Sequence, residues 1–145
     1  METKTYTSSG FSHKCSTEEL FVLTLHWLTD ITFFELEIEF LQSLINVFFI
    51  PASDSLQVKQ GYNLEEQLAE LKNRKEILKN NIIAHQNELS AILDKNLADK
   101  KDEFNSIQSV VEGDFFDFIK TFRKIKLQLF TLSKQFKQPA IMQKA

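Results

Sequence analysis

Residues that form turns are scarce in this chain, which has only 3 glycines and 2 prolines among its 145 residues. A β-rich fold of this size needs a turn about every 8 to 12 residues, and such turns usually draw on glycine or proline. The scarcity therefore excludes most β architectures. It favours an all-α fold whose helices are long and whose turns are few.

Cysteine is almost absent as well. The single residue, Cys15, cannot form a disulfide within the chain, which favours a reducing compartment. The N-terminal segment also has no apolar run of the kind that secretory signals require. We therefore expect a cytoplasmic protein.

Long uninterrupted apolar runs are missing too. The most apolar stretch, residues 20–50, contains four acidic residues: Asp30, Glu35, Glu37 and Glu39. Each such charge costs about 2.5 to 3.5 kcal/mol at the centre of a membrane helix. The sequence predicts that this stretch is buried within protein and that the chain has no membrane partner.

The 43% hydrophobic content is enough to bury one core at this chain length. The first residues are polar and show no periodicity, which is typical of a mobile terminus. We expect residues 1–15 to form a mobile N-terminal arm, residues 16–138 a single helical-bundle domain and residues 139–145 a C-terminal tail.

The first predicted helix covers residues 17–49. Ser16 and Glu19 have the spacing of a capping box at its start, and Pro51 should end it by forcing the preceding residue out of helical geometry. Its main apolar stripe is spaced mostly by alternating steps of four and three, which is a heptad pattern. The stripe contains Leu20, Trp27, Ile31, Phe34, Ile38, Leu41, Ile45 and Phe48.

A loop over residues 51–61 and a second helix capped by Asn63 and Glu66 should follow. This helix repeats the heptad spacing, although two members of its stripe, Lys75 and His85, are polar. The stripe contains Leu64, Leu68, Leu71, Lys75, Leu78, Ile82, His85, Leu89 and Ile92.

Residues 94–103 are mostly charged and mark a second turn, and a third helix should run over residues 101–137 before Pro139. One alternative stays open, because apolar spacing continues across this turn and would allow the second and third helices to be one. The third stripe contains Phe104, Ile107, Val111, Phe115, Phe118, Phe122, Ile125, Leu129, Leu132 and Phe136.

The three predicted helices have similar lengths of roughly 50 Å, at 1.5 Å per residue. Matched lengths suit helices that lie side by side along their whole extent. The sequence thus predicts an all-α fold: an antiparallel up-down-up bundle of three long amphipathic helices with coiled-coil-like packing.

The first helix carries a second apolar stripe, nearly opposite the first. A helix in a lone three-helix bundle needs one apolar face, so the second face requires a cover. Another copy of the same surface in a two-fold homodimer is the expected cover; the alternative is the loops, the N-terminal arm or a bent third helix of the same chain. The stripe contains Val22, Leu25, Phe33, Leu36, Phe40 and Val47.

Charge is distributed unevenly: residues 1–50 hold 2 basic and 7 acidic groups, and residues 113–145 hold 7 basic and 2 acidic groups. We interpret this as pairing within the bundle and expect no nucleic-acid partner, since the net charge is −3. Lys75 should pair with one of the same glutamates. The groups expected to pair are Glu35, Glu37, Glu39, Lys120, Arg123 and Lys124.

Register arithmetic places two histidines at one level of the bundle, with carboxylates nearby. Such a group forms a buried polar layer or, alternatively, a metal or small-ligand site. The paired Glu-x-x-His motifs of diiron bundles and the His-Glu-x-x-His motif of zinc helices are both absent. The group contains His26, Asp30, His85, Glu88 and Asp114.

No phosphate-binding glycine loop, nucleophile elbow or cysteine with a histidine partner is present. We therefore expect no enzymatic activity and no cofactor. The leading hypothesis is a non-enzymatic helical interaction module that self-associates through its first helix and presents further surface to a protein partner. The alternative function is a bundle that binds a metal or small ligand at His26 and His85.

Overall fold

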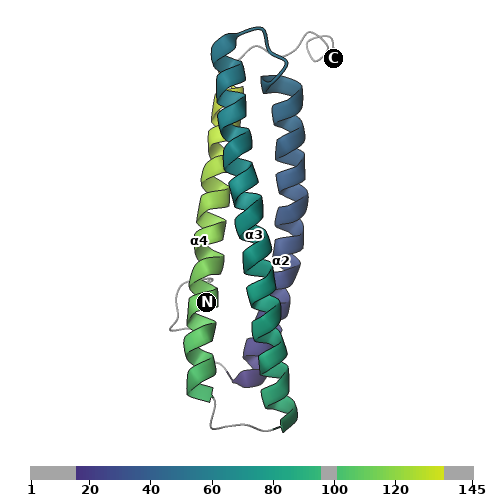
Figure 1. Cartoon of the computed structure of the whole chain (residues 1–145), viewed down its shortest axis with the longest axis vertical. Coiled ribbons are helices and arrows are strands. Elements are labelled where there is room, and N and C mark those ends of the chain that lie inside the picture. The colour runs from purple at the N-terminus through teal and green to yellow at the C-terminus, as the bar shows by residue number, and fades with distance from the viewer. Residues whose placement is uncertain (1–15, 96–100, 136–145) are drawn as a thin grey trace. The chain divides into compact units, whose positions relative to one another are not determined.

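The computed structural model describes residues 16–95 and 101–135, and within these ranges the fold is all-α, as predicted. The described elements are α2 (Thr17–Leu44), the π-helix η1 (Ile45–Phe49), α3 (Ser55–Lys95) and α4 (Lys101–Ser133) (Figure 1). The predicted arm, the tail, Cys15 and residues 96–100 of the second turn lie outside the described residues. None of the described helices is both long and apolar enough to cross a membrane.

The start of α2 confirms the predicted capping box. The backbone amide of Ser16 donates to Oε1 of Glu19 at 2.7 Å, and the amide of Glu19 donates to Oγ of Ser16 at 3.1 Å. The backbone hydrogen bond from Ser16 lowers the pKa of Glu19, because it stabilises the carboxylate. Two amides that lack partners inside the helix are thereby satisfied.

The end of this helix lies at the predicted residue but has a different cause. Ile50 keeps helical dihedral angles, so Pro51 does not expel it from helical geometry. Instead the last turn widens into η1, where the Ile50 amide donates to the Ile45 carbonyl at 3.0 Å. A proline ring clashes with the carbonyl four residues earlier, and a wider turn relieves this clash. The extra residue in the turn buries Phe49 in place of the predicted Phe48.

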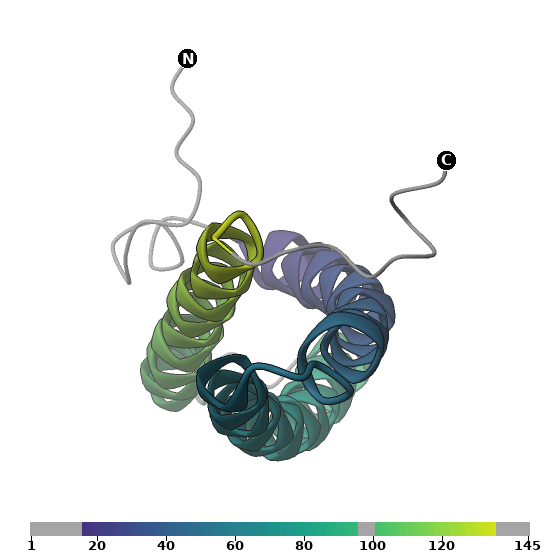
Figure 2. The same ribbon diagram turned by 90° about the horizontal axis from the view of Figure 1, so that it is seen from above.

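The predicted loop over residues 51–61 is wrong beyond residue 54, because α3 begins at Ser55. Its cap is Asp54, whose Oδ1 accepts the amides of Leu56 at 2.8 Å and Gln57 at 3.2 Å, so Asn63 lies inside the helix. Gln57 in turn donates from Nε2 to the Phe48 carbonyl at 2.6 Å. The connection can be short because Asp54 satisfies amides at the start of α3 and Gln57 satisfies a carbonyl at the end of the preceding helix. Figure 2 shows the chain reversing direction here.

Replacement of Asp54 with alanine is expected to lower the free energy of unfolding by about 1 kcal/mol, since two amides lose their acceptor. Asn63→Ala is the matched control. It lies within α3 and should change the free energy by no more than a few tenths of a kcal/mol. Urea denaturation followed by circular dichroism measures both, and a larger loss at Asn63 than at Asp54 would contradict the observed cap.

Gly61 is buried and allows α3 to lie close to the end of the preceding helix. A Cβ atom added at Gly61 would lie 2.5 Å from Cβ of Phe49 and 3.2 Å from Cδ1 of Ile50. This glycine was predicted to belong to a loop. It belongs to a helix instead, and its role is close packing rather than a turn.

The contacts divide the chain into two compact units. Unit 1 contains Met1–Thr32 and Arg74–Ile119, and unit 2 contains Phe33–Asn73 and Lys120–Ala145. Each unit takes one segment from each long helix and has its own core.

In unit 1, α2 and α4 run in the same direction, and α3 runs against them. Leu20, Leu89 and Phe104 form one core cluster, and further along α2 and α4 the rings of Trp27 and Phe115 stack with centroids 5.4 Å apart. Leu89 of α3 lies with Phe104 of α4, whereas His85, earlier in α3, bonds to Gln108, later in α4. The chain therefore reverses direction between α3 and α4, which excludes the alternative of one continuous helix.

In unit 2, α2 and α4 also run in the same direction. Phe34 lies against Phe122 with ring centroids 5.1 Å apart, and Nζ of Lys126 lies 2.6 Å from Oε2 of Glu37. The remaining core comes from all three helical segments, and it includes Ile38, Leu41, Ile45, Phe49, Leu64, Leu68, Leu71, Ile125 and Leu129.

The predicted core positions of α3 are confirmed without exception, since all nine members of its stripe are buried. The α4 stripe is wrong at one position: Gln108 is fully buried, whereas Ile107 is 36% exposed. Seven other predicted α4 positions between Phe104 and Leu129 are buried. Leu132 is half-buried, and Phe136 lies outside the described residues.

Candidate functional site

The second stripe of α2 lies at the surface of the protein. We name its members within unit 2 the α2 outer face: Phe33, Leu36, Phe40 and Val47. Phe33 is 61% exposed, Leu36 59% and Phe40 58%. In unit 1 the other two predicted interface residues, Val22 and Leu25, are also exposed. An exposed row of large apolar side chains is a common mark of a binding surface.

The spacing of the α2 outer face suits a helical partner. Steps of three, four and seven residues separate its members, and Ser43 occupies the position between Phe40 and Val47. This is the spacing at which the side chains of one helix enter the gaps between those of another.

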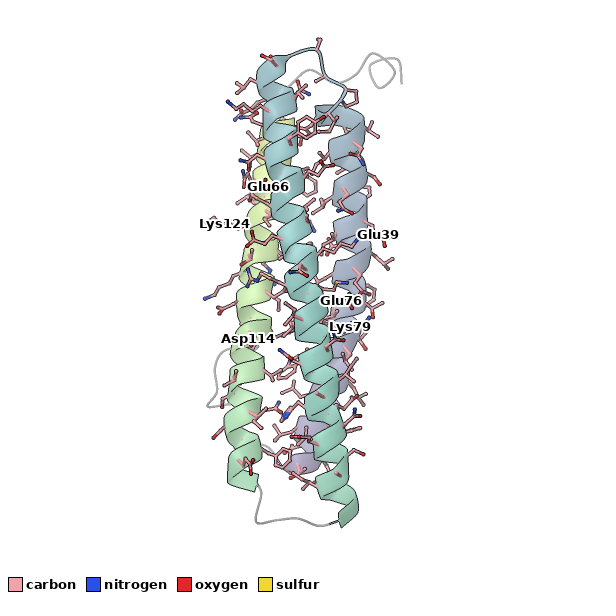
Figure 3. The ribbon with its side chains drawn as sticks, in the orientation of Figure 1. Glu39, Glu66, Glu76, Lys79, Asp114 and Lys124 are labelled. Carbon is pink, nitrogen blue, oxygen red and sulfur yellow. The ribbon has the colours of Figure 1, made fainter. Side chains whose placement is uncertain are left out.

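Carboxylates lie beside the α2 outer face. Glu37 pairs with Lys126, a cation that the sequence analysis did not name. Glu39 is exposed and lies on the outer side of α2 (Figure 3). Between Thr17 and Leu44, α2 contains six acidic residues and no lysine or arginine. The surface is therefore apolar along its centre and acidic beside it.

The three cations that were expected to pair with these glutamates are exposed on α4. They are Lys120, Arg123 and Lys124. Figure 3 shows Lys124 on the outer side of α4, away from Glu39. The ion pair between α2 and α4 in unit 2 uses Lys126, which was not predicted, and the pairing of Lys120, Arg123 and Lys124 stays a prediction.

A buried polar layer crosses unit 1. We define it as Thr24, His85 and Gln108, which are 0%, 2% and 0% exposed. Each residue lies four positions along its helix from a member of the core cluster of Leu20, Leu89 and Phe104. One helical turn of about 5.4 Å therefore separates this layer from the apolar cluster.

Hydrogen bonds connect part of the polar layer. Nε2 of His85 donates to Oε1 of Gln108, and Nε2 of Gln86 donates to Oγ1 of Thr24 at 3.3 Å. Nδ1 of His85 and Nε2 of Gln108 have no hydrogen-bond partner among the described residues. Burial lowers the pKa of His85, against smaller opposing effects of Gln108 and of the Glu88 charge. The layer thus holds a neutral imidazole with one nitrogen unsatisfied.

The structure does not assemble the predicted group around both histidines. His26, Glu88 and Asp114 are exposed, Asp30 is half-buried, and only His85 is buried. Asp114 lies six residues beyond Gln108, or about 9 Å along α4. The predicted register placed His85 level with Gly113 and Asp114, whereas it lies level with Gln108. Among the described residues, no group of three or more histidines, cysteines and acidic residues is arranged to hold a metal.

Lys75 is also buried in the α3 stripe, and its Nζ lies 2.8 Å from Oε2 of Glu76. Its predicted pairing with a glutamate of α2 stays a prediction.

A small open hollow lies further along unit 1, with side chains of both charges at its edge. It is lined by Arg74, Ile77, Leu78, Asn81, Asp114, Asp117 and Phe118.

Two members of the polar layer, Thr24 and Gln108, were missed. A strict alternation of four and three residues through Leu20, Trp27 and Ile31 includes Thr24, and the same alternation from Phe104 to Val111 includes Gln108. Both were passed over because they are polar.

Comparisons with protein-family models, curated proteins and solved structures find no match to this chain.

Proposed function

We propose that this protein is a non-enzymatic helical interaction module, and that it self-associates through the α2 outer face. Two copies, at least one of which contributes this face to the contact, form its smallest assembly, a homodimer with coiled-coil-like packing. The proposal places the protein in the cytoplasm, because a chain with one cysteine does not depend on an oxidising compartment.

The observation that carries the proposal is the exposure of Phe33, Leu36 and Phe40 on one side of α2. Scattered apolar residues are normal on a protein surface, but a continuous row at heptad spacing is not. Covering such a row removes apolar area from water and stabilises an assembly by about 25 cal/mol per Å² before the costs of association.

The test is the double variant Phe33→Glu/Phe40→Glu. Unpaired charges in an interface cost about 2 to 5 kcal/mol, so the dissociation constant should rise at least about 30-fold. Sedimentation velocity over a concentration series is the measurement. The helical circular dichroism signal should stay unchanged, because both side chains point away from the core.

Ile77→Glu/Val110→Glu is the matched control, since both residues are exposed and apolar but lie on α3 and α4. This variant should associate like the unmodified protein. If the unmodified protein is monomeric at high micromolar concentration, the proposal is wrong. Unfolding of the Phe33 and Phe40 variant would show instead that these residues belong to the core.

A further inference from the structure

Unit 2 carries a second unusual surface, on α4. Its residues from Lys120 to Gln135 include five lysines and arginines and no acidic residue. Lys126 pairs with Glu37, whereas the other four cations are exposed. At 68%, Leu127 is the most exposed large hydrophobic residue among those described. We name this surface the α4 basic face: Lys120, Arg123, Lys124, Leu127, Phe130 and Lys134.

The α4 basic face and the α2 outer face have complementary charge. The α2 outer face has exposed Glu39 beside its apolar centre, as well as Glu37, which Lys126 already pairs, and α2 between Thr17 and Leu44 has no lysine or arginine. If α2 paired with α2 of a second copy, carboxylates would accumulate at the interface without a lysine or arginine from either helix. Such an arrangement opposes association.

The two faces also match in length and in apolar content. Phe33 to Val47 and Lys120 to Lys134 each span 14 residue steps, or about 21 Å. Leu127 and Phe130 supply apolar contacts, and the stems of lysine side chains cover apolar surface while their charges reach water. Cations also bind to phenylalanine rings, as Lys126 does over Phe122 at 5.9 Å within unit 2.

From these observations we infer that the α2 outer face of one copy docks on the α4 basic face of a second copy. This inference rests on the proposed self-association and names the surface that the second copy presents. The first copy then keeps its α4 basic face unused and the second keeps its α2 outer face, so the contact does not close after two copies. The assembly grows with concentration, and salt weakens it because ion pairs contribute.

The test uses two variants that each disable one face. Phe33→Gln/Phe40→Gln disables the α2 outer face, since it removes the apolar contacts without adding a charge that the cations could pair with. Lys120→Glu/Lys124→Glu disables the α4 basic face. Each variant alone should be monomeric at concentrations where the unmodified protein associates. An equimolar mixture should form a 1:1 complex, because each variant retains the face that the other needs. Sedimentation velocity and circular dichroism follow association and folding.

Lys59→Glu/Lys72→Glu is the control for net charge, since it makes the same charge change at two exposed α3 lysines of unit 2. It should associate like the unmodified protein. An increase from 50 to 500 mM NaCl should raise the dissociation constant of the unmodified protein at least about tenfold.

The possible failures are distinguishable. If the α4 variant still associates, the inference is wrong and the proposed function stands. If the α2 variant still associates, the proposed function is wrong. A mixture that stays monomeric overturns the inference, and so does a monomeric unmodified protein that binds phosphatidylserine vesicles through the α4 basic face.

Discussion

Alanine at Gly61 is expected to destabilise the protein, although alanine is the better helix former. Helix propensity alone favours Gly61→Ala by about 1 kcal/mol. The new Cβ atom would lie 2.5 Å from Cβ of Phe49, and neither atom belongs to a flexible side-chain end. Overpacking of this kind costs typically 1 to 3 kcal/mol, or more when the backbone has to move. We expect a net loss of about 1 to 2 kcal/mol.

Gly113→Ala is the matched control because Gly113 also lies within a helix, and a Cβ atom there meets nothing within 4 Å. It should stabilise the protein by about 1 kcal/mol. Thermal denaturation should thus show melting temperatures that shift in opposite directions, by roughly 4 °C per kcal/mol for a domain of this size. A rise in melting temperature for both variants would contradict the close contact at Gly61.

The second expected result concerns the polar layer. His85→Leu alone leaves the buried amide of Gln108 without its partner, and Gln108→Leu alone does the same to the imidazole. Each single variant should lose about 1 to 3 kcal/mol. The double variant His85→Leu/Gln108→Leu removes both buried polar groups that need a hydrogen-bond partner, and it should be more stable than either single variant. Urea denaturation of all four proteins measures this, and additive losses would contradict a direct His85–Gln108 bond.

The pH dependence of the same proteins gives an independent test. The pKa of His85 is lowered in the folded state, so the unfolded chain binds a proton more readily. Stability from this residue is complete above about pH 6.5 and is lost as the pH falls, by at most about 1.4 kcal/mol per pH unit. The double variant lacks this loss. The free energies of unfolding of the unmodified protein and the double variant should therefore differ by different amounts at pH 7.5 and pH 5.5. An equal difference at both pH values would contradict the prediction.

Periodicity predicted most of the fold because core positions recur along a helix whatever the fold around them. The α3 stripe is correct even at Lys75 and His85, where polar residues occupy core positions. Capping chemistry was equally informative at Ser16, where both partners lie within four residues of each other. These features depend on local sequence, so a single chain is enough to predict them.

The errors occurred where a local preference has two physical meanings. Gly61 signals a turn or a close contact, and only the position of Phe49 decides between them. Gln108 signals a surface residue or a member of a buried layer, and only the imidazole of His85 decides. The predicted level of Asp114 failed for a related reason, because local sequence alone does not fix how two helices align across a turn. The α2 outer face lies at the surface, but the identity of a molecule that covers it depends on partners outside the chain, which one sequence does not describe.

The polar layer also has a consequence for how unit 1 selects one alignment of its helices. A heptad row of apolar residues is nearly unchanged by a shift of seven positions, so such rows leave several alignments close in energy. A seven-residue shift of α3 against α4 would move His85 from Gln108 to the level of Phe115 in one direction. In either direction it would separate the imidazole from its amide partner and bring Gln108 level with a buried apolar residue of α3, Ile92 or Leu78. The layer thus favours one alignment of the helices over the shifted ones. It does so while leaving two buried nitrogen atoms, Nδ1 of His85 and Nε2 of Gln108, without a hydrogen-bond partner among the described residues.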